Sequence, residues 1–88
     1  MQDVILYTKA NCGLCDQAYQ ILLNLAYDTP LRINLIDITQ NHRTHAKYME
    51  RIPVLATSHP DIELNWPFTV EDVQAFLDKS EVLPDFDE

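Results

Sequence analysis

Residues 4–15 read VILYTKANCGLC and contain the features that decide the fold. The first four form a continuous apolar run, which is typical of a central strand buried on both faces. A short loop follows and leads to Cys12 and Cys15, the only two cysteines of the chain. Gly13, the only glycine, lies between them. This stretch therefore predicts a strand that leads directly into a helix carrying a C-x-x-C pair at its start.

Helical periodicity follows the cysteines. Two adjoining apolar stripes recur at the spacing of an α-helix, namely Leu14, Ala18, Ile21 and Leu25, and Cys15, Ala18, Leu22 and Ala26. They predict an amphipathic helix from about Cys12 to about Tyr27, ending before Pro30 because a helix rarely continues into the residue before proline.

The middle of the chain predicts a second strand and a short helix. Apolar and polar residues alternate over 31–35, and two isoleucines follow, which is typical of a strand over 31–38. Residues 39–41 offer cap-type side chains for a helix that runs to about Glu50. We expect this helix to present a thin apolar face of Ala46 and Met49.

The last third predicts a hairpin and a final helix. Residues 54–57 and 62–65 are apolar-rich and flank the turn-forming stretch 58–61, as in an antiparallel hairpin. Thr69 and Asp72 have the three-residue spacing of a capping box. The helix that they open has an apolar face of Val73, Phe76 and Leu77.

The resulting order, β-α-β-α-β-β-α, predicts an α/β fold with a four-stranded mixed sheet and helices on both faces. The β-α-β unit makes its two strands parallel, and the hairpin adds antiparallel strands. The length of 88 residues allows one domain, which we place at 1–80. Residues 81–88 hold four carboxylates and form an acidic tail that we expect to fray.

The charge excludes several classes of partner. Six basic and 14 acidic residues give a net charge of −8, which disfavours binding to nucleic acid and to anionic membranes. The apolar run at 4–7 is too short for a signal peptide, and no stretch is long enough to span a membrane. We therefore expect a monomer in the reducing cytoplasm, where a C-x-x-C pair is rarely a structural disulfide.

The cysteine pair indicates thiol–disulfide exchange. A helix N-terminus stabilises a thiolate, which makes Cys12 the nucleophile and leaves Cys15 to resolve a mixed disulfide. Gly13 keeps the approach to Cys12 open. The pair could instead be two small buried residues or half of a zinc site. The scattered histidines and the lack of a second C-x-x-C disfavour zinc, so we expect no metal.

Two motifs resemble the glutaredoxins. Residues 7–15, YTKANCGLC, are similar to the opening of that family, in which an aromatic strand end and a lysine precede C-x-x-C. Residues 51–54, RIPV, resemble its second landmark, a cis-proline before the third strand. The resemblance covers nearly the whole chain, and it implies a thioredoxin-like fold, cysteine chemistry and a glutathione-linked activity.

The resemblance also implies roles for neighbours of the cysteines. Lys9 would add positive charge near Cys12, and Gly13 and Leu14 would face the substrate between the two cysteines. Ile52 would offer its backbone to an extended substrate, and a cis Pro53 would pack opposite the cysteines. On the residues alone, a solvated loop lysine is the better interpretation of Lys9, and the less favoured alternative for Pro53 is an ordinary proline at the start of a strand.

One motif of the family is missing. Glutathione-binding glutaredoxins carry a Gly-Gly pair and an acidic residue after the fourth strand, whereas residues 65–69 read NWPFT here. The resemblance is therefore to short bacterial glutaredoxin-like proteins that lack Gly-Gly. Trp66 and Phe68 are core anchors or an apolar platform beside the cysteines, and core is the interpretation we favour. Lys9 and Arg51 adjoin the predicted site and offset part of the negative charge there.

The predicted function is dithiol exchange. The substrates are disulfide-containing proteins or glutathione mixed disulfides, and the missing Gly-Gly favours proteins. We expect no tightly bound cofactor, with glutathione as a reductant or co-substrate. The first alternative is a non-catalytic module that responds to redox state or ligates a metal or an iron–sulfur cluster. The second is an interaction domain with a vestigial cysteine pair.

Overall fold

The computed structural model describes residues 2–58 and 61–81. The elements follow one another as β1 (Gln2–Thr8), α1 (Gly13–Ala26), β2 (Leu31–Asp37), a 3-10 turn η1 (Ile38–Gln40), α2 (His42–Tyr48), β3 (Val54–Ser58), β4 (Asp61–Asn65) and α3 (Val70–Glu81). Apart from η1, this is the predicted order. His59 and Pro60, in the predicted hairpin turn, and residues 82–88, in the predicted tail, lie outside the described residues. Glu81, which we placed in the tail, is the last residue of α3.

The four strands form one mixed sheet in the order β2-β1-β3-β4. β1 and β2 are parallel, and the other two pairs are antiparallel. Thr8 lies opposite Asp37, and Val54 lies between Tyr7 and Asn65. The ends of β1, β2 and β4 and the start of β3 therefore meet at one edge of the sheet, which we call the site edge.

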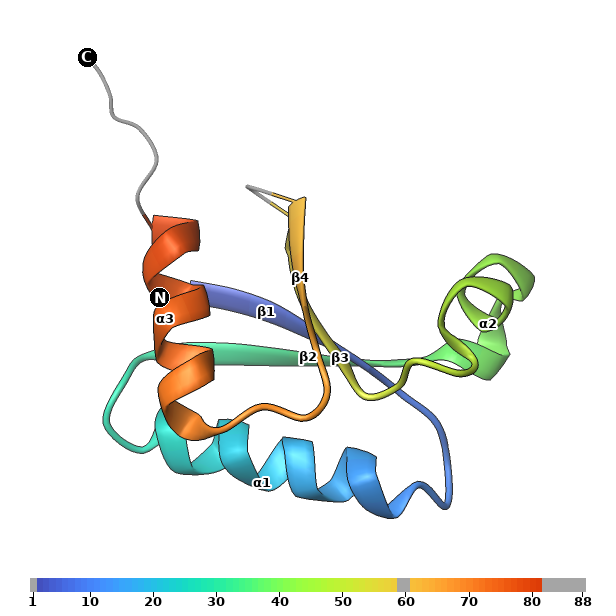
Figure 1. Cartoon of the computed structure of the whole chain (residues 1–88), viewed down its shortest axis with the longest axis horizontal. Helices are drawn as coiled ribbons and strands as arrows, with labels where there is room; N and C mark the ends of the chain where they lie inside the picture. Colours follow the sequence, from blue (N-terminus) through green and yellow to red (C-terminus); the bar gives the residue numbers. More distant parts are fainter. Residues whose placement is uncertain (1, 59–60, 82–88) are drawn as a thin grey trace.

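Two helices cover one face of the sheet. Figure 1 shows α1 and α3 lying together on this face. The buried residues between sheet and helices form the main core, which comprises Val4, Leu6, Ala18, Leu22, Leu25, Leu55, Phe68, Val73, Phe76 and Leu77. Burying a large apolar side chain stabilises a fold by about 1.5–3 kcal/mol, so this face supplies most of the apolar stabilisation. Trp66 packs against the same core and contacts Phe68 edge to face, which confirms the core interpretation of both residues.

The opposite face is covered by α2 only at one end. A second cluster there joins Ile38, Tyr48 and Val54, with Tyr7 and Ile52 packed against it. In Figure 1, α2 lies beyond the strands, away from α1 and α3. Because α2 is so short, Ile5 and Tyr7 are half-buried, and the expectation that the whole run 4–7 is buried on both faces is wrong.

The apolar face predicted for α2 is also wrong. Ala46 is exposed and Met49 is 47% exposed, whereas Tyr48 is buried. The helix begins at His42 and ends at Tyr48 rather than Glu50. The Tyr48 ring stacks on Tyr7 of β1, with centroids 4.1 Å apart. One aromatic side chain thus anchors α2, in place of two aliphatic ones.

No helix in the described part of the chain is long and apolar enough to cross a membrane.

Candidate dithiol site

Cys12 and Cys15 are joined in a disulfide at the start of α1, with their Cα atoms 5.2 Å apart. Cys12 is the N-cap residue of the helix, and its backbone is extended. Its sulfur accepts the backbone N–H of Cys15 at 3.2 Å. Helix N-caps supply acceptors for N–H groups that have no partner within the helix. An N–H group that points at a cysteine sulfur from a helix N-terminus is of the kind that stabilises a thiolate.

The two sulfurs differ in their environment. Cys15 is 3% exposed and belongs to the buried face of α1, whereas Cys12 is half-buried. A nucleophile must be reached by its substrate, while a resolving thiol needs to reach only the first cysteine. The burial of the pair therefore agrees with the order of roles proposed from the sequence.

Asn11, directly before Cys12, has a φ of 59°, in the left-handed region. It has the only positive φ among the non-glycine residues described. Asparagine tolerates this conformation better than other residues with a side chain. The sequence analysis did not single out Asn11, although an asparagine at a tight strand-to-helix turn is a recognisable signal.

The other residues near the cysteines are exposed. A Cβ at Gly13 would meet no atom within 4 Å, so the protein leaves this position open. Leu14 is 48% exposed beside the disulfide. Lys9 is exposed and makes no ion pair with any residue that the structure describes, so its proposed electrostatic role stays a prediction.

Ile52 and Pro53 lead into β3 at the site edge, where β1 ends and the cysteine loop begins. The peptide bond between them is cis, and Pro53 is fully buried. Val54, the next residue, lies opposite Tyr7 near the end of β1. The Ile52 N–H donates to the Tyr48 carbonyl at 3.1 Å. The Ile52 N–H is therefore occupied within the protein, and the contact of its backbone with a substrate stays a prediction.

A polar cluster supports the segment before Pro53. Glu63 on β4 accepts the Tyr48 hydroxyl at 2.5 Å with one oxygen and Arg51 Nη2 at 2.7 Å with the other. Arg51 Nη2 also donates to Asn65 Oδ1 at 3.0 Å. Tyr48 and Glu63 were not predicted from the sequence, because their contact depends on strand pairing and not on spacing along the chain.

These contacts shift two pKa values in opposite directions. The pKa of Glu63 is lowered, first by the hydrogen bond from Tyr48 and then by Arg51 and Lys47. The pKa of Tyr48 is raised, chiefly by burial and then by its hydrogen bond to Glu63. Both shifts favour the neutral tyrosine donating to an ionised glutamate.

Two backbone N–H groups at the N-terminus of α3 are capped by side chains of the same segment. Thr69 N–H donates to Asp72 Oδ2 at 2.9 Å, and Asp72 N–H donates to Thr69 Oγ1 at 3.1 Å. The predicted capping box is thus confirmed. The preceding loop holds Pro67, which has no N–H. These donors are therefore not available to an external carboxylate.

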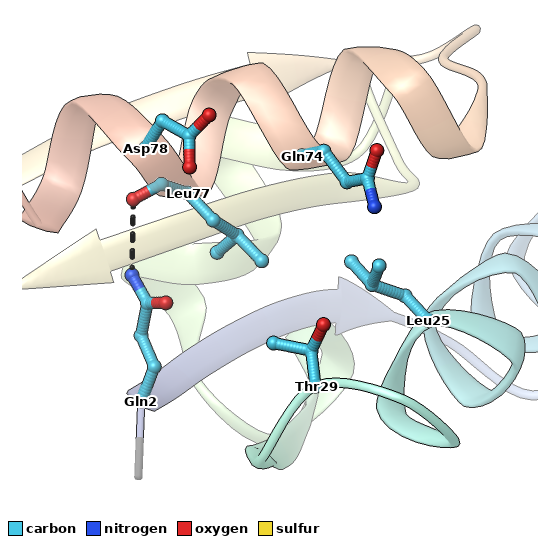
Figure 2. Close-up of a pocket in the computed structure, with 6 residues that line it drawn as sticks. All are labelled: Gln2, Leu25, Thr29, Gln74, Leu77 and Asp78. Carbon is cyan, nitrogen blue, oxygen red and sulfur yellow. Dashed lines mark hydrogen bonds between the residues drawn. The ribbon is translucent and has the colours of Figure 1, made fainter.

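A shallow pocket of about 310 Å³ lies at the other end of the molecule. Figure 2 shows it between the start of β1, the end of α1 and the end of α3. There Gln2 Nε2 donates to the Leu77 carbonyl at 3.2 Å. Because β1 starts at this pocket and ends at the site edge, the pocket is no part of the dithiol site. In residues 2–58 and 61–81, no group of three His, Cys, Asp or Glu side chains is placed to hold a metal ion.

The fold and the bonded C-x-x-C pair define the class of this protein as a thioredoxin-fold protein with redox thiol chemistry. The family is set by residues 3–78, which match the model of the glutaredoxin-like domain (DUF836). The chain belongs to that family. A search of curated proteins finds no match.

Solved structures agree with the assignment. A structural-genomics target protein from X. campestris is 32% identical, with a TM-score of 0.75 over 86% of this chain and 96% of that one. A single-site mutant of a thioredoxin from Halobacterium salinarum is 18% identical, with a TM-score of 0.69 over 93% of this chain and 77% of that one. Thioredoxin O2 from Arabidopsis thaliana, in the oxidised state, is 19% identical, with a TM-score of 0.63 over 88% of this chain and 72% of that one. The two thioredoxins support the fold alone.

Proposed function

We propose that this protein is a glutaredoxin-like thiol–disulfide oxidoreductase that acts on protein disulfides. The proposal rests on one observation: the sulfur of the half-buried Cys12 caps α1 and accepts the Cys15 N–H, while Cys15 itself is 3% exposed. Such an arrangement stabilises one thiolate for attack and keeps the second within reach to resolve the product.

In the proposed reaction, the Cys12 thiolate attacks one sulfur of the target disulfide. The Cys12–target bond forms, the target disulfide breaks, and the leaving sulfur takes up a proton. Cys15 then loses its proton and attacks the Cys12 sulfur, which releases the second target sulfur as a thiol. The target gains two electrons and two protons, and the Cys12–Cys15 disulfide stores the oxidation. A dithiol donor reverses these steps to regenerate the enzyme, so no tightly bound cofactor is needed.

Two observations favour protein disulfides over glutathione. The backbone N–H groups of Thr69 and Asp72 at the start of α3 already donate to internal acceptors, so a glutathione carboxylate that used the Thr69 N–H would have to displace the Asp72 carboxylate. Leu14 exposes an apolar side chain beside the disulfide, and apolar contact of this kind suits a protein surface.

Cysteine variants test the proposal with insulin as the disulfide substrate. Cys12→Ser is expected to abolish insulin reduction, because it removes the attacking sulfur. Cys15→Ser is expected to accumulate a mixed disulfide between Cys12 and insulin, seen by mass spectrometry without reductant. Retention of full activity by Cys12→Ser would refute the mechanism.

A further inference from the structure

Basic residues are concentrated in one segment of this acidic chain. Residues 42–51 hold three of the six Lys and Arg residues and a single acidic residue, Glu50. Their net charge is +2, so the other 78 residues together carry −10. Charge separated in this way orients a protein in the field of a charged partner.

The three basic residues form a continuous strip, which we call the α2 strip: Arg43, Lys47 and Arg51. Arg43 and Lys47 are four residues apart on α2 and so share one face of the helix. Lys47 Nζ and the Arg51 guanidinium carbon each lie 5.1 Å from the centroid of the Tyr48 ring. The side chains of Lys47 and Arg51 are 61% and 36% exposed, and Arg43 is exposed as well.

Glu63 holds the strip in place and offsets one of its three positive charges. It accepts Arg51 Nη2 at 2.7 Å and lies 3.8 Å from Lys47 Nζ. Arg51 Nη2 also donates to Asn65. Among the described residues, no hydrogen bond comes from Arg51 Nε or Nη1. One carboxylate therefore faces two cations, and Arg51 keeps donors for a partner.

The strip lies at the same end of the molecule as the dithiol. Arg51 directly precedes Ile52 and Pro53, which join the sheet at the site edge, where β1 ends and leads to Cys12. Figure 1, drawn with the longest axis horizontal, shows α2 and the start of α1 toward the same end. The other two cations outside the cysteine loop, Arg32 and Lys79, lie elsewhere: Arg32 pairs with Asp3 near the start of β1, and Lys79 is in the last turn of α3.

We propose that the α2 strip docks an acidic surface on the protein that exchanges disulfides with Cys12. This inference rests on the proposed function and names the chemistry of its partner. Because the rest of the chain carries −10, an acidic partner is repelled except where it meets the strip, so it arrives at the dithiol end. A protein partner fits better than a small anion, because Arg43 and Lys47 alone are separated by about 6 Å of helix rise and Arg51 extends the strip further.

Three synthetic peptides test the inference. Each has the same length and is closed by one disulfide, which is flanked by acidic, neutral or basic residues. The second-order rate constant for reduction by the fully reduced protein is measured at low and at high salt. The test variant is Arg43→Glu with Lys47→Gln, in which a neutral amide at 47 avoids placing an acid against Glu63. The matched control, Arg32→Glu with Lys79→Gln, changes the net charge equally at other places.

We expect the wild type to reduce the acidic peptide roughly tenfold faster than the basic one at low salt, at the low end of electrostatic steering. This preference is expected to shrink at high salt, where exposed charges are screened. The test variant is expected to lose or reverse the preference, and the control is expected to keep it within about twofold of the wild type.

Other outcomes overturn the inference. If the control variant lost the preference for the acidic peptide to the same extent as the test variant, net charge alone would set this preference. If the test variant also reduced glutathione disulfide more slowly than the wild type, by the same factor as for the acidic peptide, the strip would attract small anions in general. Equal rates for all three peptides would be consistent with the proposed function and would contradict the proposal that the α2 strip is a docking surface. If the wild type reduced none of the peptides, the proposed function itself would fail.

Discussion

The Tyr48 hydroxyl donates to Glu63 Oε2 at 2.5 Å, which links α2 to the edge strand β4. The other carboxylate oxygen of Glu63 accepts Arg51, two residues before Pro53. One side chain on β4 thus holds both the helix and the segment that leads to the cis-proline. Loss of the Glu63 carboxylate therefore affects the contacts with Tyr48, Arg51 and Lys47, whereas loss of the Tyr48 hydroxyl affects only the first of them.

Glu63→Ala is expected to destabilise the protein more than Tyr48→Phe. The alanine leaves the buried Tyr48 hydroxyl without its acceptor, which costs about 1–3 kcal/mol. The phenylalanine removes the donor and leaves a partly exposed carboxylate that water can reach, so the loss is about 0.5–1.5 kcal/mol. Urea unfolding of both variants measures which of them has the lower free energy of unfolding. Glu50→Ala, at an exposed acid, is the control and should stay within about 0.5 kcal/mol of the wild type. The reverse order would contradict the role assigned to Glu63.

The same carboxylate makes stability depend on acid pH. The pKa of Glu63 in the folded protein is below its usual value of 4.5. Its contribution is therefore fully present above about pH 4.5 and is lost as the pH falls through the lower folded pKa. Glu63→Gln keeps an acceptor for Tyr48 and has no acid to titrate. The free energy of unfolding should fall more steeply below pH 4.5 in the wild type than in Glu63→Gln, and equal slopes would contradict the prediction.

The features that could be predicted from the sequence are those that depend on residues close together along the chain. The strand, the turn and the N-capping cysteine all lie within residues 4–15. The capping box of α3 needs only the three-residue spacing of Thr69 and Asp72, and the structure contains both of its hydrogen bonds. The order of elements then limited the topology to a few choices.

The parts that sequence missed depend on contacts between distant residues. Tyr48 and Glu63 are 15 residues apart and meet only because β4 pairs with β3 in a particular register. The burial of Tyr48 follows from its stacking on Tyr7, 41 positions earlier. A short helix that is anchored by one aromatic ring has no repeating aliphatic residues. The apolar face was therefore predicted, wrongly, at Ala46 and Met49. That Pro53 packs opposite the cysteines was implied only by the family resemblance, and it stays a prediction.

Asn11→Gly is expected to preserve stability, whereas Asn11→Val is expected to reduce it by about 1–2 kcal/mol. Asn11 has a φ of 59°, and a β-branched side chain is strained in that region, whereas glycine is not. Urea unfolding of both variants in the oxidised state gives the comparison. Asn24→Val, at an exposed position inside α1, controls for the general effect of valine. If Asn11→Val were as stable as the wild type, the backbone turn before Cys12 would not constrain this position.

Gly13→Ala is expected to leave the fold intact and to affect only the approach of a substrate. An added Cβ meets no atom of the protein within 4 Å, and Gly13 has no positive φ. Alanine at this helical position should stabilise the protein, by up to about 0.5–1 kcal/mol. The reduction of a small aromatic disulfide should be unchanged, while that of a folded protein disulfide should slow if a partner surface passes close to Gly13. A loss of stability would contradict the open environment of this residue.

Redox titration in glutathione buffers is expected to give the Cys12–Cys15 disulfide with little glutathione adduct. The two Cα atoms lie 5.2 Å apart and the sulfurs are already bonded in this structure, so Cys15 should displace glutathione from Cys12 faster than the adduct accumulates. The Thr69 and Asp72 N–H groups at the start of α3, which already have internal acceptors, further limit binding of the tripeptide. Mass spectrometry of the quenched protein separates the species, and Cys15→Ser, which cannot close the disulfide, supplies the adduct as a reference. A dominant adduct on Cys12 in the wild type would mean that glutathione binds without the Gly-Gly motif, and would make glutathione, rather than a protein, the expected substrate.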